Sequence, residues 1–230
     1  MKNTKLFRKA FIFIAAAGIS LFITGCDENG GITIPSGATE LTVSAKSNNN
    51  LLNPPANIVI TEAKALISKV EFEQESNQNN QIIKDAPFVV NFNTDGTLKE
   101  ITTSYIIKDF YTKAKFQIHK VEDNESSPDP EFISGSQRYS FIIKGTFNGT
   151  PFVYKSKKSA NIVINFSNTV NINLKKMNIT LVFNPAAWFA AGSNSLNPSD
   201  PQNETTIDDN IKSSFRQAFQ DDNKDGNPDN

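Results

Sequence analysis

The stretch "RYSFIIKGTFNGTPFVYKS", residues 138–156, decides the class of fold. Two runs in which apolar residues alternate with polar ones flank the dipeptide Asn148-Gly149. Both of these turn residues tolerate a positive φ, which a type I′ turn requires at its two central positions. The stretch therefore predicts two antiparallel strands joined by a tight hairpin.

The clearest single strand is "DFYTKAKFQIHKVE", residues 109–122, where apolar and polar residues alternate. A period of two is typical of a strand with one face in the core and the other in water. The predicted core face holds Phe110, Ala114, Phe116 and Ile118, and the predicted solvent face holds Lys113, Lys115, Gln117 and His119.

Similar runs fill most of the middle of the chain, and we count roughly ten short strands without a long helix among them. The other strand-like runs are residues 40–46, 57–73, 87–93, 160–166 and 170–184. Stretches rich in Asn, Ser, Pro and Asp predict loops at residues 73–81, 122–137 and 192–204. The pattern predicts an all-β domain over residues 41–192, an antiparallel β-sandwich of Ig-like or transthyretin-like type.

The pattern changes near the C-terminus. After a predicted loop at residues 193–204, apolar residues recur at helical spacing and predict an amphipathic helix over residues 205–220, with Thr205 or Thr206 as its cap. The apolar stripe consists of Ile207, Ile211, Phe215, Ala218 and Phe219. The helix is followed by a tail rich in Asp and Asn, residues 221–230.

The N-terminus has the order of a secretory signal peptide over residues 1–25. A positive segment precedes an apolar segment, residues 10–23, that is too short for a comfortable bilayer span. "ITGC" then ends at Cys26, the single cysteine of the chain, and resembles the lipobox of bacterial lipoproteins. That resemblance implies cleavage before Cys26 and acylation of its thiol, which attaches the protein to a membrane. The alternative is an uncleaved anchor helix with an incidental cysteine.

Residues 26–40 follow as a predicted flexible tether. Its acidic start, Asp27 and Glu28, resembles the surface-export signals of lipoproteins in Bacteroidota, whereas an Asp in that place of enterobacterial lipoproteins resembles an inner-membrane retention signal. We expect a location in the cell envelope, lipid-anchored at the outer membrane, on its periplasmic side or at the cell surface.

Charge and cysteine usage exclude several classes of function. Residues 1–26 carry four Lys or Arg and no acid, so cleavage changes the formal net charge from −1 to −5. An acidic chain is a poor partner for nucleic acid, because phosphate contacts need clustered Lys and Arg. Once Cys26 is acylated, no disulfide and no cysteine-ligated zinc can form.

The tail contains a candidate cation site. Asp221, Asn223, Asp225, Asn227 and Asp229 match the first ligand positions of an EF-hand-type calcium loop, with a glycine at its sixth position. The bidentate glutamate of the twelfth position is absent, which limits the expected affinity to dissociation constants of about 10⁻⁴ to 10⁻³ M. The alternative is a solvated acidic tail with coincidental spacing.

Three further candidates have simpler interpretations beside the functional one. Trp188 offers a platform for stacking a sugar, or else closes one end of the sandwich. His119 is a candidate base or metal ligand, or else an exposed residue, since no second His accompanies it. Glu71, Glu73 and Glu75 are candidate paired carboxylates, or else a solvated sheet edge.

No nucleophile-elbow, metalloprotease, Walker or dinucleotide-binding motif occurs in the sequence, so we expect no enzymatic activity and no required cofactor. The lipobox, "FNPAAWF", "LNPSDPQNETTIDDNIKSSFRQAF" and the Asp-Gly tail together resemble a group of Bacteroidota-type lipoproteins of uncharacterised function. The resemblance implies a lipid-anchored sandwich with a binding or structural role. The alternatives are a carbohydrate-binding surface protein and a fimbrial or adhesin-like subunit that exchanges strands.

Overall fold

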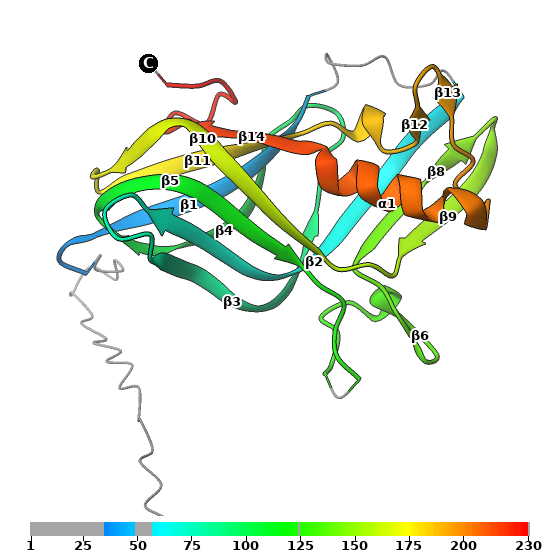
Figure 1. The fold of residues 1–230 in the computed structure, drawn as a ribbon, viewed down its shortest axis with the longest axis horizontal. Helices are drawn as coiled ribbons and strands as arrows, with labels where there is room; N and C mark the ends of the chain where they lie inside the picture. The colour runs from blue at the N-terminus through cyan, green and yellow to red at the C-terminus, as the bar shows by residue number, and fades with distance from the viewer. Residues whose placement is uncertain (1–34, 49–56, 124, 230) are drawn as a thin grey trace, which may run out of the picture. The chain divides into compact units, whose positions relative to one another are not determined.

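The computed structural model describes residues 35–48, 57–123 and 125–229, which lie in one compact unit (Figure 1). The predicted signal peptide, Cys26 and the first part of the predicted tether lie outside these residues. Within the described ranges, no helix is both long enough and apolar enough to cross a membrane. The chain folds mainly into strands, and two sheets pack as the predicted sandwich.

The larger sheet is built around one 17-residue strand, β2. The strand β3 pairs along one edge of β2, while β5 and β8 follow one another along the opposite edge. The outer neighbours of β5 and β8 are β10 and β9. The bounds are β2 Ile58–Gln74, β3 Asn80–Asn91, β5 Asp109–Ile118, β8 Phe141–Phe147, β9 Thr150–Ser156 and β10 Ala160–Ile172.

The predicted hairpin is confirmed. The strands β8 and β9 pair antiparallel from Phe147 opposite Thr150 outward, and the turn residues Asn148 and Gly149 have φ values of 51° and 78°. Positive φ at both positions is the backbone shape that the Asn-Gly pair predicts.

The smaller sheet has the order β14-β11-β1-β4. Its central pair, β1 and β11, runs parallel, whereas its other pairs are antiparallel as predicted. The sheet begins earlier than the sequence predicts, because Thr39 is already buried and donates a hydrogen bond to Leu174 O over 2.6 Å. The bounds are β1 Ala38–Ser47, β4 Lys99–Ile107, β11 Lys176–Phe183 and β14 Phe215–Gln220.

The predicted helix over residues 205–220 is wrong in its second half. The helix α1 is Glu204–Ser213, and β14 begins at Phe215. The apolar residues after Ser213 fit a helical stripe, but the edge of β11 offers unpaired main-chain groups that β14 satisfies by pairing antiparallel. The last strand of the sandwich thus lies outside the predicted boundaries of 41–192.

Aromatic side chains fill the core between the sheets. Phe183 stacks on Trp188 with ring centroids 5.8 Å apart, and Phe92 and Phe141 pack on the same group. Phe215, from the last strand, stacks on Phe183 at 5.5 Å. These rings come from segments far apart in the sequence, so the core joins both sheets and the segment after β11.

A bulge in β5 changes which aromatic residue enters the core. Glu73 pairs with Lys113 but Gln74 pairs with Tyr111, so the alternation shifts at Thr112. Tyr111 is therefore fully buried, while Phe110 is 47% exposed. The prediction that Phe110 lies on the core face is wrong for this reason.

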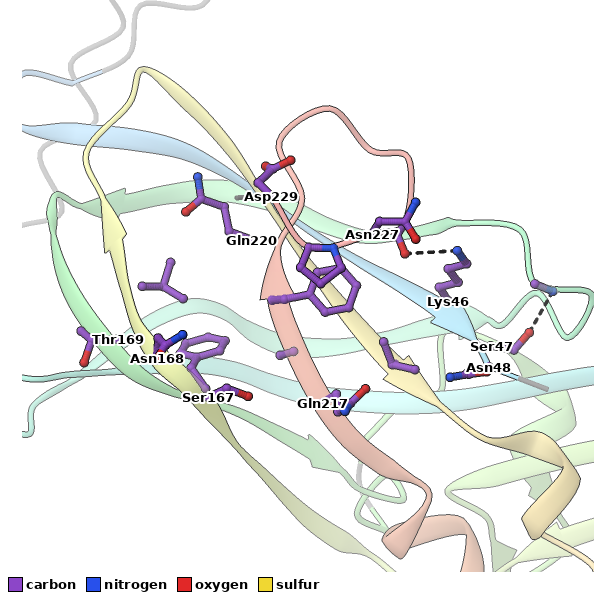
Figure 2. Close-up of a pocket in the computed structure, with 18 of the residues that line it drawn as sticks. Lys46, Ser47, Asn48, Ser167, Asn168, Thr169, Gln217, Gln220, Asn227 and Asp229 are labelled. Atoms are coloured by element: carbon purple, nitrogen blue, oxygen red, sulfur yellow. Dashed lines mark hydrogen bonds between the residues drawn. The ribbon is translucent and has the colours of Figure 1, made fainter. Parts of the chain in front are cut away.

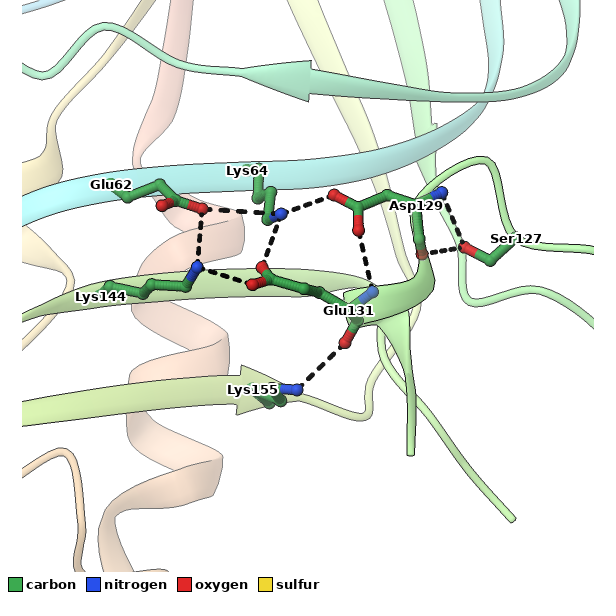
Figure 3. Close-up of polar contacts among 7 residues, drawn as sticks. All are labelled: Glu62, Lys64, Ser127, Asp129, Glu131, Lys144 and Lys155. Carbon is green, nitrogen blue, oxygen red and sulfur yellow. Dashed lines mark hydrogen bonds and ion pairs between the residues drawn. The ribbon is translucent and has the colours of Figure 1, made fainter. Parts of the chain in front are cut away.

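The segment predicted as a loop at residues 122–137 packs on the larger sheet through a second small core that contains Leu66, Phe132 and Ile142. An ion-pair cluster lies beside it (Figure 3). The Lys64 ammonium group lies 2.5 Å from Asp129 Oδ2 and 2.6 Å from Glu131 Oε2. The segment contains η2 Pro130–Phe132, β6 Ile133–Ser134 and β7 Gln137–Arg138.

The remaining short elements connect β11 to α1. They are η3 Pro185–Ala187, β12 Ala190–Ala191, β13 Asn194–Ser195 and η4 Pro201–Asn203. A proline begins each of these 3-10 turns, and an Asn or Asp side chain caps it by accepting a main-chain N–H. This connection places Trp188 in the core, and α1 packs on the same core through Ile207 and Ile211.

Candidate functional site

An open cleft of about 820 Å³ lies where edge strands of the two sheets meet (Figure 2). One wall is β10 of the larger sheet and another is β14 of the smaller sheet. The end of β1, Val182 of β11, the turn between β3 and β4, and residues 226–229 complete the lining. The cleft is therefore assembled from segments that span nearly the whole folded unit.

Neutral hydrogen-bonding side chains are the largest group among the residues that line the cleft. The polar set is Ser47, Asn48, Ser167, Asn168, Thr169, Gln217, Gln220 and Asn227. The apolar contacts are Phe166, Val170, Val182, Ala218, Phe219 and Pro228. Among its described lining residues, the titratable side chains are Lys46, Asp95 and Asp229. Such a lining can donate and accept many hydrogen bonds to an uncharged polar molecule.

The rim of the cleft is held by its own hydrogen bonds. Asp95 Oδ1 accepts from the Thr97 hydroxyl over 2.6 Å and from its N–H over 3.0 Å, and these bonds lower the pKa of Asp95. Gly96, with φ of 89°, donates its N–H to Ser47 Oγ over 2.9 Å. The turn between β3 and β4 is thereby tied to the end of β1.

The tail, predicted as a calcium loop or a solvated end, packs on the outer face of the smaller sheet. A line of buried polar groups leads to it from β1. Ser44 Oγ donates to Asn178 Oδ1 over 2.8 Å, Asn178 Nδ2 donates to Thr180 Oγ1 over 3.0 Å, and Thr180 Oγ1 donates to Asp221 Oδ2 over 2.6 Å. Asp221 is fully buried, so the first residue of the tail is not solvated.

The tail forms a closed loop, Asp221–Asp229. Gly226 N–H donates to Asp221 Oδ2 over 3.1 Å, and Asp222 N–H donates to Asp229 Oδ2 over 2.6 Å. Asn223 Oδ1 and Asp225 Oδ1 accept from N–H groups two residues further on. No group of three or more Asp, Glu, His or Cys side chains in the described ranges is placed to hold a metal ion. The calcium loop therefore stays a prediction.

Trp188 is not placed to stack on a ligand. Its side chain is fully buried and its Nε1 donates to Ser214 Oγ over 2.8 Å. The prediction of a sugar platform at this residue is wrong, because the ring contributes to the core of the sandwich. The aromatic side chains that line the cleft are Phe166 of β10 and Phe219 of β14.

The other candidates are distributed over the larger sheet. His119 follows β5, and its Nε2 lies 3.6 Å from Glu122 Oε1. Glu73 is buried on an interior strand, so the interpretation as part of a solvated sheet edge is wrong for this residue. Hydrogen bonds from Lys113 and Lys115 lower the pKa of Glu73. Glu75 lies at the end of the same strand and accepts from Thr169 Oγ1 over 3.0 Å.

No protein-family model and no curated protein matches the chain. Among solved structures, it is similar to MbnP from Methylosinus trichosporium, with 8% sequence identity over 70% of this chain and 82% of that chain, at a TM-score of 0.44. A likeness at that level carries no functional argument. The class defined by the structure is a β-sandwich with a polar cleft and a packed acidic loop beside it.

Proposed function

We propose that the protein is a lipid-anchored, non-enzymatic binding protein of the cell envelope, and that its cleft binds a carbohydrate. The observation that carries the proposal is the lining of the cleft. Its volume of about 820 Å³ lies within the 300–1,000 Å³ range typical of small-molecule sites.

The chemistry of the lining matches that of a sugar. Each sugar hydroxyl donates one hydrogen bond and accepts others, and the amides of Asn168 and Gln217 offer both kinds of partner. The C–H face of a sugar ring is apolar, and Phe219 and Pro228 supply an apolar counterpart. An anionic ligand would instead need several cations, whereas Lys46 is the lysine in the lining and its Nζ donates to Gly226 O over 3.1 Å.

Membrane attachment through Cys26 is supported by the side chains near Pro35, where the described part of the chain begins. Pro35 is nine residues after Cys26, a length of chain that spans at most about 30 Å. Lys108 N–H donates to Gly37 O near this point. Three apolar side chains in this region are each about half exposed: Ile107 at the end of β4, Phe110 at the start of β5, and Leu174 between β10 and β11. Exposed apolar side chains are favoured at a membrane surface, so this end suits contact with the lipid.

Acylation is tested with Cys26→Ser in the full chain. We expect the wild type to incorporate labelled palmitate and fractionate with membranes, and the variant to do neither, because an alcohol does not replace the thiol as acyl acceptor. Equal labelling of both proteins would refute the anchor.

Carbohydrate binding is tested on the soluble chain that begins at Asp27. A glycan array identifies a ligand, and calorimetry then compares Asn168→Ala and Gln217→Ala with the wild type. We expect each variant to bind at least about tenfold more weakly, because each loses hydrogen bonds to the ligand. Asn171→Ala, exposed near the end of β10 and outside the lining, is the matched control. Unchanged affinity in both cleft variants would refute the site.

A further inference from the structure

We propose that the loop Asp221–Asp229 is a calcium site, with Asp221 as its buried ligand, and that the bound ion fixes the wall of the cleft formed by Asn227, Pro228 and Asp229. The metal site stands on the geometry of the loop alone. The effect of the bound ion on ligand affinity in the cleft rests on the proposed function. Separate experiments test the metal site and this effect.

The first observation is an unpartnered oxygen. The Asp221 carboxylate is fully buried, and its Oδ2 accepts from the Thr180 hydroxyl and from Gly226 N–H. Its Oδ1 is also buried but has no hydrogen-bond partner. Leaving an oxygen of a buried carboxylate without a partner is costly, and a bound cation removes that cost.

The second observation is that this oxygen belongs to a turn already shaped for a cation. Asp221 Oδ2 is held by the N–H of Gly226, so the carboxylate lies inside the turn that the loop makes. Asn223 and Asp225 are exposed and lie two and four residues further along the same turn. Gly226 has φ of 80°, and a Cβ there would meet Lys46 Nζ at 2.6 Å. Only glycine fits this turn without displacing the lysine.

The loop is also attached to the sheet on both sides of the turn. Asn178 N–H donates to Asp222 Oδ1 over 2.8 Å, and Asp229 N–H donates to Gln220 O over 2.9 Å. These bonds hold the loop in place before any ion binds. A preformed loop lowers the conformational entropy that ion binding must otherwise overcome.

The charge balance of the loop is strongly negative. Asp221, Asp222, Asp225 and Asp229 carry four carboxylates, and Lys224 is the single basic residue among positions 221–229. The Lys224 ammonium group lies 3.8 Å from Glu100 Oε2 on β4. The acids of the loop are therefore in excess over its cations, which favours a divalent cation.

The donor set selects calcium over other metals. The loop offers carboxylate, amide and main-chain oxygens but no His or Cys, which disfavours zinc and copper. Calcium accepts six to eight oxygens in irregular geometry, whereas magnesium keeps much of its water shell. Two carboxylates, Asp221 and Asp225, combine with neutral oxygens and water, so the site does not need three convergent acids. The absent glutamate of the twelfth position sets the expected dissociation constant at about 10⁻⁴ to 10⁻³ M.

Calorimetric titration of the soluble chain with calcium chloride alone tests the site. We expect one calcium per chain, with magnesium binding at least about tenfold more weakly. Asp225→Asn, an exposed substitution that leaves the core intact, should weaken calcium binding at least about tenfold. Asp123→Asn, an exposed acid between β5 and η2, should leave it unchanged. Absence of calcium binding up to 10 mM, or equal affinity in Asp225→Asn and wild type, would overturn the site.

Thermal unfolding gives an independent readout. At ten times the dissociation constant, calcium multiplies the ratio of folded to unfolded protein about elevenfold, which corresponds to a rise in Tm of about 4 °C for a chain of this size. Asp221→Asn should lose that rise even if its starting Tm differs, because the comparison is made with and without calcium in the same variant. An equal rise in Asp221→Asn and wild type would show that calcium acts elsewhere.

Hydrogen exchange tests the link to the cleft. With calcium, we expect exchange at Asn227 and Asp229 to slow by a larger factor than exchange in the hairpin of β8 and β9, which reports only the general stabilisation. An equal slowing factor at both places, or no slowing at the loop, would refute the local effect. Calcium binding without any glycan binding would refute the proposed function alone, and glycan binding without calcium binding would refute this inference alone.

Discussion

The indole Nε1 of Trp188 donates a hydrogen bond to Ser214 Oγ over 2.8 Å, and Ser214 is the residue that joins α1 to β14. The same Oγ donates to Ile211 O over 2.7 Å at the end of the helix. One hydroxyl therefore connects the buried ring to the place where the chain changes from helix to strand.

Ser214→Ala should lower the free energy of unfolding by about 1 to 3 kcal/mol, because it leaves the buried indole N–H without an acceptor. Ser213→Ala, one residue earlier and exposed, should change it by less than about 0.5 kcal/mol. Urea unfolding of the two variants beside wild type measures both. Equal stability of the two variants would contradict the role of this bond.

Gly145→Ala should be strongly destabilising, because β8 approaches the bulge in β2 so closely that a Cβ at this position would lie 2.0 Å from Val59 O. The strands must separate to admit it, and we expect a loss of about 3 kcal/mol. Thr146→Ala, the next residue, is the control with no such clash. A Gly145→Ala protein as stable as wild type in urea would show that the two strands separate freely.

Acid should weaken the ion-pair cluster beside η2 (Figure 3). Hydrogen bonds from Lys64 and Lys144 lower the pKa of Glu131 from 4.5 to about 2. A carboxyl group whose pKa is lowered by folding stabilises the protein above its unfolded pKa, and this contribution is lost as the pH falls from about 4.5 to about 2. Glu131 is 43% exposed, so solvent screening limits the contribution to about 1 kcal/mol.

Unfolding measured at pH 7, 4 and 3 tests this linkage. Glu131→Gln should be less stable than wild type at pH 7 and should show a smaller loss of stability between pH 4 and pH 3. Asp123→Asn should follow the wild-type pH dependence. The prediction fails if Glu131→Gln and wild type lose stability in parallel.

Tyr154→Phe should remove the hydrogen bond that links β9 to α1. The Tyr154 hydroxyl donates to Asp208 Oδ1 over 2.6 Å, and Asp208 Oδ2 is already buried without a hydrogen bond. The substitution leaves both oxygens without a hydrogen-bond donor, so we expect a loss of about 2 kcal/mol in urea unfolding. Tyr139→Phe, a half-buried tyrosine of the segment before β8, should cost less than about 0.5 kcal/mol. Similar losses in both variants would contradict the prediction.

High pH gives a second readout on the same tyrosine. Burial, with the nearby Asp208 carboxylate, raises the pKa of Tyr154. The neutral hydroxyl is therefore favoured in the folded state, and the contribution is present below the unfolded pKa of about 10 and is lost as the pH rises above it. Tyr154→Phe should show less loss of stability between pH 9 and pH 11 than wild type.

The parts of the fold that the sequence predicts correctly are those decided by local chemistry. Asn148-Gly149 specifies its turn without reference to the rest of the chain, and the alternation around it specifies two strands. The sequence pattern does not predict β4, because "KEITTSYII" carries polar residues on both faces of a strand at the sheet edge. Its position depends on β1, which precedes it by more than fifty residues.

The misplaced elements depend on distant partners. The stretch from Phe215 to Gln220 has apolar residues that fit a helix as well as a strand, and the open edge of β11 decides between them. Tyr111 replaces Phe110 in the core because of a one-residue bulge that no pattern in "DFYTKAK" indicates. The cleft is assembled from segments near both ends and the middle of the folded unit, so no single motif could predict it.

The parallel pair of β1 and β11 determines when the protein can fold. Strand β1 pairs with β4 on one side and with β11, which ends at Phe183, on the other. The remaining edge of β11 pairs with β14. Pairings between such distant residues form slowly, because closing the long loop between them costs entropy before the new contacts add stability. If the proposed signal peptide directs export, a chain that crosses a membrane from its first residue onward emerges with β1 still lacking one of its partners. Such a chain would need protection from aggregation until residue 220 has crossed, and the rate of export would then limit the rate of folding.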